Sequence, residues 1–487
     1  GCGLMVPCKT LMIGLLLGLT YHSSVAAEPD VSSSDRSVGW PQYKRNSERT
    51  GNSPLETLTF PLHRISAIQF PAPIYASPAV SHGRAYIQDA LGHVACVDSK
   101  QNKLHWLTKI DGMKNTSSPA LAHHKVYIGS SAGYLAILEM STGNLLKKVV
   151  TDSAVICAPA VTNSAVYFST MNGKLIKIDF AGNVIWTFDG RAPSYVEIAV
   201  KGNEILFSCG NPASSGAANQ VLRLLDRGDR VEIVDRWSVL NPTGGPVFGP
   251  LGTIGLQSFD SELGAFQVLS SGRQVRSYRS SRRWHTDSRI TPSVRDGKYY
   301  LGEKIFTPEA KFEWEASVKF LYQGASHSSP ALTKEHMVLG TEKGQLLFFD
   351  IHDPSKPDEP EWVFLTERAG KSNGAISSSP AVADGRVFFG GEDGIFYTLG
   401  QGSRSKINLQ MSTALSTSSP QEIGERPNQF EWHTVGGDMT YSLVSPDQHI
   451  KPPFRVKWKT RIWGSFKSPM IIAQGRVYCA SRVGQVT

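Results

Sequence analysis

The chain has 487 residues, of which 40% are hydrophobic and 19% are charged. This composition excludes a disordered chain, which would combine few hydrophobic residues with a high net charge. The 50 lysines and arginines exceed the 42 aspartates and glutamates, and the resulting net charge of +8 is a mild basic bias that does not define a partner.

The N-terminal residues are typical of a secretory signal. Lys9 precedes an apolar run over residues 11–19, and small residues at 25–27 precede Glu28. The run is shorter than the roughly 20 residues that a membrane-spanning helix needs. We therefore expect residues 1–27 to be a cleaved signal peptide. The mature chain would have no membrane span and would be exported to the periplasm or cell envelope.

Cysteines after this segment are widely spaced, at Cys96, Cys157, Cys209 and Cys479. Their spacing matches neither a zinc site nor a disulfide framework. The first three lie in or beside strand-like apolar stretches, where cysteine usually acts as a small buried hydrophobic residue. We expect these three to be structural.

A short phrase that places proline after a small residue recurs seven times. Its copies begin at Ser77, Ser118, Ala158, Thr291, Ser329, Ser379 and Ser468. Pro78, Pro119 and Pro159 are separated by 41 and 40 residues, which is the period of a four-stranded propeller blade. Weaker copies at Glu197 and Gly249 bring the blade starts before residue 400 to eight.

Each repeat continues in the same way. An alternating apolar strand follows the phrase, a glycine turns the chain, a third strand ends at an acidic residue, and several copies place a tryptophan in the last strand. Those tryptophans are Trp106, Trp186, Trp314 and Trp362. The pattern predicts an all-β fold over residues 40–400, an eight-bladed β-propeller of four-stranded antiparallel blades.

A second, longer period is present. A shift of 392 residues places Trp432 on Trp40 and Pro446 on Pro54. Two interpretations stay open for residues 429–487: the truncated start of a second propeller, or a closing blade of the first. Residues 401–428, rich in Ser, Thr and Gln, are the predicted linker.

The stretches 97–106, 138–144 and 178–186 resemble the alanine-x-Asp-x-x-Thr-Gly-x-x-x-Trp signature of pyrroloquinoline quinone (PQQ) type propeller repeats. This resemblance covers about residues 40–400 and resumes near Trp432. It implies the quinoprotein alcohol dehydrogenase-like superfamily. That superfamily includes dehydrogenases that bind PQQ and calcium, and BamB-like periplasmic scaffold proteins that bind no cofactor and engage protein partners.

The chain departs from the dehydrogenase pattern. It has no adjacent cysteine pair, and its short repeats leave little room for the insertions that carry the dehydrogenase's catalytic and calcium-binding residues. No Gly-x-Ser-x-Gly elbow, phosphate-binding loop or His-Glu-x-x-His motif occurs. We expect no cofactor and no metal, and we assign no catalytic residue.

One basic run stands out between residues 273 and 289. Guanidinium groups, interspersed there with aromatic side chains, bind phosphate or carboxylate groups. The candidate partner-binding residues are Arg273, Arg276, Arg279, Arg282 and Arg283. Export argues against nucleic acid and favours protein or glycolipid phosphates. The alternative is a solvated insertion between blades five and six.

Together these observations predict an exported, noncatalytic β-propeller scaffold, similar to BamB-like assembly factors, that binds a protein or polymer partner in the cell envelope. The alternative is a divergent PQQ-dependent oxidoreductase with PQQ and calcium in the central channel. A third possibility is a module of a larger protein whose activity lies elsewhere.

Overall fold

The computed structural model describes residues 39–210, 219–260, 263–279, 290–302, 304–315, 327–351, 359–371, 373–409, 411, 471–473 and 476–478. These residues belong to one compact unit, residues 38–487. The predicted signal peptide and Cys479 lie outside the described residues. No helix in the described ranges is long and apolar enough to cross a membrane.

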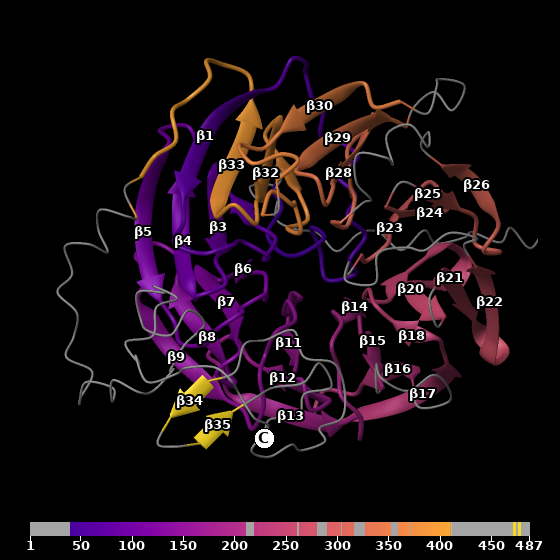
Figure 1. Cartoon of the computed structure of the whole chain (residues 1–487). Coiled ribbons are helices and arrows are strands. Elements are labelled where there is room, and N and C mark those ends of the chain that lie inside the picture. Colours follow the sequence, from indigo (N-terminus) through magenta and orange to yellow (C-terminus); the bar gives the residue numbers. More distant parts are fainter. Residues whose placement is uncertain are drawn as a thin grey trace, which may run out of the picture. The chain divides into compact units, whose positions relative to one another are not determined.

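The described residues form eight antiparallel sheets in a ring, the predicted eight-bladed β-propeller (Figure 1). The innermost strands of blades 1 to 8 are β2 (Ala79–Ser81), β6 (Ala120–Ala122), β10 (Ala160–Val161), β14 (Ala199–Lys201), β18 (Asn241–Pro242) with β19 (Val247–Phe248), β23 (Ser293–Arg295), β27 (Ala331–Leu332) and β31 (Ala381–Ala383). The second strands are β3 (Arg84–Gln88), β7 (Lys125–Ser130), β11 (Val166–Ser169), β15 (Glu204–Cys209), β20 (Ile254–Asp260), β24 (Lys298–Leu301), β28 (His336–Gly340) and β32 (Arg386–Gly390).

The third strands are β4 (His93–Asp98), β8 (Tyr134–Glu139), β12 (Lys174–Ile178), β16 (Gln220–Asp226), β21 (Leu263–Ser270), β25 (Lys304–Phe306), β29 (Gln345–Asp350) and β33 (Ile395–Gly400). The outermost strands are β5 (Lys103–Lys109), β9 (Leu145–Val150), β13 (Val184–Asp189), β17 (Val231–Ser238), β22 (Gln274–Arg279), β26 (Phe312–Glu315), β30 (Trp362–Leu365) and, in blade 8, β1 (His63–Gln69). Short 3-10 turns cover Pro250–Gly252 and Ser271–Arg273.

The ring closes through its first strand. β1 pairs antiparallel with β33, so residues from both ends of the repeat region make blade 8. On its other edge β1 bonds to the chain after blade 8: Asn408 N donates to Ala67 O and Gln69 N to Asn408 O. Blade 8 therefore has four strands without any residue of 429–487. In that segment the described residues form a separate pair, β34 (Ile471–Ala473) and β35 (Arg476–Tyr478), and the domain boundaries there remain a prediction.

The repeated phrase has a structural reason. The hydroxyl group that precedes its proline accepts a hydrogen bond from the equivalent backbone N–H of the previous blade. These bonds run from Gly245 N to Thr291, Thr291 N to Ser329, Ser329 N to Ser379, Ser379 N to Ser77 and Ser77 N to Ser118, over 2.8–3.1 Å. We call this set the hydroxyl belt. It links blades 5, 6, 7, 8, 1 and 2 close to the axis.

The start of blade 5 differs from the sequence prediction. The copy at Gly249 was expected to open this blade, but Pro250 lies in the turn after the innermost strand. The true copy starts at Gly245, whose N–H joins the hydroxyl belt. Two glycine-proline steps four residues apart made the later one look like the blade start.

The core lies between neighbouring blades, where the faces of successive sheets pack together. Tryptophans of the outermost strands help to join these faces. Trp106 Nε1 donates to Met140 O at 3.0 Å, and Trp186 Nε1 to Asp226 Oδ1 at 3.2 Å, in each case across to the next blade. The first three cysteines are buried and not joined in disulfides, as the sequence predicts, and burial raises the pKa of Cys96 to about 12.

Candidate functional site on the propeller axis

A segment that precedes β1 lies on the axis of the ring. Residues 40–56, here called the axial segment, pass the inner strands of successive blades, and their indigo trace runs inside the ring in Figure 1. Within the described residues the segment accepts N–H groups from every blade except blade 5. The bonds join Trp40 O to Val80 N, Pro41 O to Leu121 N, Gln42 Oε1 to Val161 N, Ser47 O to Val200 N, Thr50 O to Val294 N, Gly51 O to Leu332 N, and the Glu56 carboxylate to Asp384 N and Gly385 N, over 2.7–3.1 Å. One segment therefore ties seven blades together.

The axial segment turns sharply in its middle. Lys44, Arg45 and Arg49 have positive φ angles of 56°, 71° and 62°, in the left-handed region that non-glycine residues adopt only in a small fraction of cases. The Asn46 side chain holds the turn, because its Oδ1 accepts from Thr50 N at 3.0 Å and its Nδ2 donates to Thr50 Oγ1 at 2.8 Å. This conformation directs the side chains on either side of the turn into the ring.

Arg49 bonds to two of the three blades that lack the belt hydroxyl. Its fully buried guanidinium donates to Tyr43 O (2.9 Å), Ala158 O (3.1 Å), Pro159 O (3.0 Å) and Ile198 O (2.9 Å). Blades 3 and 4 carry Ala158 and Glu197 at the belt position. Burial lowers the pKa of Arg49 to about 10, while the nearby charge of Glu197 acts in the opposite direction. The guanidinium therefore stays charged at neutral pH and links blades 3 and 4 through their carbonyl oxygens, where belt bonds are missing.

Lys44 and Tyr43 occupy the opposite side of the axis. Lys44 Nζ donates to Pro330 O at 2.7 Å and also bonds to Ser293 Oγ, and burial holds the pKa of this lysine well below its usual value. Tyr43 Oη bonds to Ser329 Oγ of the hydroxyl belt at 2.8 Å. Gly51 makes room for the amine, since a Cβ at this position would lie 2.5 Å from both Lys44 Nζ and Ser293 Oγ.

This arrangement does not fit PQQ with calcium at this level of the axis. A flat aromatic tricarboxylate needs an open slot, but the side chains of Tyr43, Lys44 and Arg49 occupy the space and bond to the chain's own groups. Calcium needs six or more converging oxygen ligands. In the part of the chain that the structure describes, no group of three or more His, Cys, Asp or Glu residues could hold a metal ion.

The residues just before the innermost strands include a set of half-buried side chains. At the position two residues before the belt residue stand Tyr75, Thr116, Ile156, Tyr195, Thr243, His327 and Ser377. Ser377 Oγ donates to Glu392 Oε1, and His327 Nε2 lies 3.8 Å from the same oxygen. The serine thus bonds to the carboxylate and not to the imidazole, so these three side chains do not form the relay that activates a serine nucleophile.

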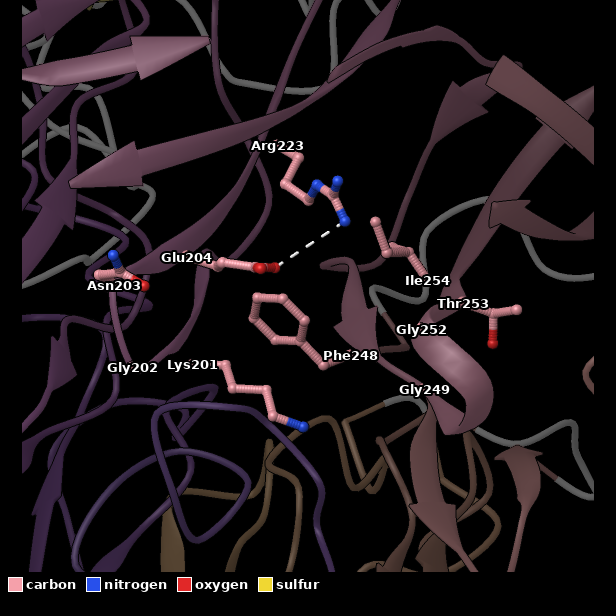
Figure 2. Close-up of a pocket in the computed structure, with 10 residues that line it drawn as sticks. All are labelled: Lys201, Gly202, Asn203, Glu204, Arg223, Phe248, Gly249, Gly252, Thr253 and Ile254. Atoms are coloured by element: carbon pink, nitrogen blue, oxygen red, sulfur yellow. Dashed lines mark ion pairs between the residues drawn. The ribbon is translucent and has the colours of Figure 1, made fainter. Parts of the chain in front are cut away.

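Two cavities lie away from the axis. One, of about 410 Å³, is lined by Phe60, His336 and Glu361 among others, and His336 Nε2 lies 2.9 Å from Glu361 Oε2. The second, of about 360 Å³, lies between blades 4 and 5 (Figure 2). We call it the inter-blade groove; its lining includes Lys201, Arg223 and Phe248.

The structure does not bring Arg276 and Arg279 together. Arg276 and Arg279 are exposed on β22, the outermost strand of blade 5, so the alternative of an insertion between blades is wrong for them. They are three residues apart in an unbroken register, which directs them to opposite faces of the strand. Arg273 ends the 3-10 turn before β22, and Arg282 and Arg283 lie outside the described residues. Partner binding by these arginines stays a prediction.

The ring of four-stranded blades, closed by its own first strand, makes this chain an eight-bladed β-propeller. Residues 90–224 match the family model described as outer membrane protein assembly factor BamB, which confirms the resemblance to PQQ-type repeats in that range. No curated protein matches the chain by sequence.

Solved structures agree on the fold. BamB from Moraxella catarrhalis is 14% identical with a TM-score of 0.51, over 71% of this chain and 99% of its own. The quinohemoprotein alcohol dehydrogenase from Comamonas testosteroni is 13% identical with a TM-score of 0.57, over 78% of this chain and 82% of its own. The computationally designed Ika8 protein is 14% identical with a TM-score of 0.53, over 70% of this chain and all of its own. Proteins with different functions thus share this architecture, so the likeness defines the fold alone.

Proposed function

We propose that this chain is an exported, noncatalytic propeller scaffold that binds a protein or polymer partner in the cell envelope. The observation that carries the proposal is the axial segment. It occupies the axis with buried side chains whose polar groups bond to the ring itself. Recognition would then fall to the outside of the ring, and we infer that no quinone or metal is required.

Apolar side chains on the outer strands of three consecutive blades support this proposal. Large aliphatic residues are usually removed from water, and their clustering on a surface is typical of interaction sites. The exposed residues are Leu145, Leu146 and Val150 on β9, Val184 and Ile185 on β13, and Ile233 and Val234 on β17, each between 41% and 77% exposed. The match of residues 90–224, which include β9 and β13, to an assembly factor model favours a protein partner.

The proposal is tested by photo-cross-linking in cells. A photoreactive residue at Leu146, which is 52% exposed on blade 2, is compared with one at Leu365, which is 56% exposed on the outermost strand of blade 7. We expect a discrete cross-linked product in the envelope fraction from the first position and not from the second. Equal products from both positions, or none from either, would contradict the scaffold.

The alternative, a PQQ-dependent oxidoreductase, is tested separately. Calorimetric titration of the folded full chain with PQQ and calcium should give no saturable heat. Binding near one quinone per chain, accompanied by dye-linked alcohol oxidation, would overturn the scaffold proposal.

A further inference from the structure

The inter-blade groove lies beside blade 5, from which, within the described residues, the axial segment accepts no N–H group. Its walls come from the β14–β15 turn of blade 4, including Lys201 and Glu204, and from the turn of blade 5 that ends at Ile254. Figure 2 shows the Phe248 ring between these walls and Arg223 above them. Two features of its walls bear on what it can bind.

The first feature is a residue exchange in blade 4. At the second-strand position opposite the middle alanine of the phrase, blades 1 to 3 carry Tyr86, Tyr127 and Tyr167. Two of these hydroxyls bond to the next blade, Tyr127 Oη to Phe180 O at 2.9 Å and Tyr167 Oη to Asp226 Oδ2 at 2.7 Å. Blade 4 has Leu206 at this position. Leu206 is fully buried in the core between blades 4 and 5, but it has no hydroxyl and so cannot make the bond to the next blade that Tyr127 and Tyr167 make.

The second feature is a backbone edge in blade 5. Hydrogen-bonded and non-hydrogen-bonded pairs alternate along an antiparallel ladder. Gly249 N donates to Thr253 O, so the next pair, Phe248 with Ile254, is a non-hydrogen-bonded pair. The N–H and C=O of Phe248 therefore point away from β20. The axial segment bonds to the equivalent N–H of Val80 in blade 1, but within the described residues none of its bonds reaches Phe248.

The chain itself shows what such an edge binds. On blade 1, Trp40 N and O form a two-bond bridge with Val80 O and N, at 2.9 and 2.7 Å. The axial segment is irregular, with β-bridges at Trp40 and Asn52, and on the inner strands of blades 2, 4, 6 and 7 its carbonyl oxygens accept the equivalent N–H. Phe248 offers the same pair of backbone groups, while the residue itself is buried in the core between blades 4 and 5. The matching ligand is an extended polypeptide segment.

Charge further restricts the ligand. The Lys201 side chain is 57% exposed, and its ammonium lies 3.5 Å from the Glu48 carboxylate, a loose pair. Arg223 is held by Asp235 at 2.7 Å and lies 4.0 Å from Glu204. Lys201 is therefore the cation that can exchange its partner most easily, and a carboxylate on the incoming segment would bind it.

We propose that the inter-blade groove binds an extended, acidic segment of a partner protein, which pairs with the backbone of Phe248 and places a carboxylate on Lys201. This inference rests on the proposed scaffold function and names the chemistry of its partner.

A random dodecapeptide phage library, selected on the full chain, supplies the probe. We expect the enriched peptides to contain Asp or Glu close to apolar residues. Phe248→Pro removes the N–H at a position where the ladder does not use it, so it should weaken binding of a synthesised peptide about tenfold. The matched control is Phe248→Val, which keeps the N–H and carries the residue type found at Val80; it should bind within about twofold of the parent.

A second variant keeps the test valid if Phe248→Pro does not fold. Lys201→Gln removes an exposed charge without placing a carboxylate beside Glu48 and Glu204, and should also weaken the peptide about fivefold, with a melting temperature within about 2 °C of the parent. If the library enriches no peptide, or if all variants bind with equal affinity, the proposal that the groove binds a peptide segment is overturned. If the Leu146 cross-link persists while these variants leave binding unchanged, the scaffold function stands and only the groove is rejected.

Discussion

Arg49 makes the most concentrated set of contacts on the axis. Its guanidinium is the common donor for four carbonyl oxygens from the axial segment, blade 3 and blade 4. Arg49→Ala would leave these buried oxygens without a donor. We expect the free energy of unfolding to fall by about 3 kcal/mol. Chemical denaturation of the full chain measures this change.

The control for that measurement is Arg404→Ala. The Arg404 side chain is 70% exposed and lies 3.4 Å from Glu367, so its loss should change the free energy of unfolding by less than about 0.5 kcal/mol. Equal effects of the two substitutions would mean that the bonds of Arg49 add nothing to stability.

Lys44 should make stability depend on pH. Burial lowers the pKa of its amine in the folded state, so between that lowered pKa and the unfolded value of about 10.4 the unfolded chain binds a proton that the folded chain does not. Stability from this group therefore rises with pH across that window, by up to about 1.4 kcal/mol per pH unit, and is lost as pH falls.

The comparison with Lys44→Met isolates this effect. The methionine fills a similar space without a titrating group, and Ser293 Oγ still bonds to Pro330 O at 2.6 Å. Denaturation curves recorded between about pH 7 and about pH 9.5 should give a stability difference, parent minus variant, that grows with pH. A difference that stays constant would show that Lys44 is protonated in the fold.

Neither residue is predicted from the sequence as part of a site. Charged side chains in a turn normally face solvent, and their partners here lie far along the chain, 109 residues away for the Arg49 bond to Ala158 and 286 for the Lys44 bond to Pro330. The one available signal is the long period, because its shift repeats both Trp40 and Pro54 and so marks residues 40–54 as a unit.

At the scale of elements, the ring binds the axial segment through backbone hydrogen bonds, as it could bind a separate peptide. A protease site inserted after the exposed Thr57 would cut it from β1. We expect the cut segment to stay bound and to elute with the ring in size exclusion, because its bonds to seven blades do not depend on that link. Release of the segment with an unchanged melting temperature would contradict its role in holding the blades.

Strands proved easier to predict than the axis. Ser77 and its equivalents repeat because five of the eight blades accept the same inter-blade hydrogen bond through a hydroxyl at this place, so one physical requirement recurs along the sequence. Blade 5 shows the limit of this signal, since Gly245 lacks the hydroxyl and a second glycine-proline step follows at Gly249. Groups that occur once, such as the axial segment, have no periodic pattern to predict them.

For the whole molecule, the ring needs its first strand and the residues just after blade 8. Ser405 N and Asn408 N bond to β1, and Met411 is fully buried in the core around blades 7, 8 and 1. We therefore expect residues 39–411 to fold alone, with the circular dichroism spectrum of a β protein and a melting temperature within about 3 °C of the full chain. A broad or absent transition would mean that later residues are part of the ring.

The axial segment also sets an order of events during synthesis. It emerges from the ribosome before any blade, yet its last partner, Gly385, is 329 residues away from Glu56. At about 5–20 residues per second, roughly 16–66 seconds pass between the two. Trp40 can bond to Val80 early in this interval, but Tyr43, Lys44 and Glu56 lack their partners in the later blades for most of it. The finished ring is therefore held at its centre by the axial segment, which is made before any blade and completes its contacts only when blade 8 is present.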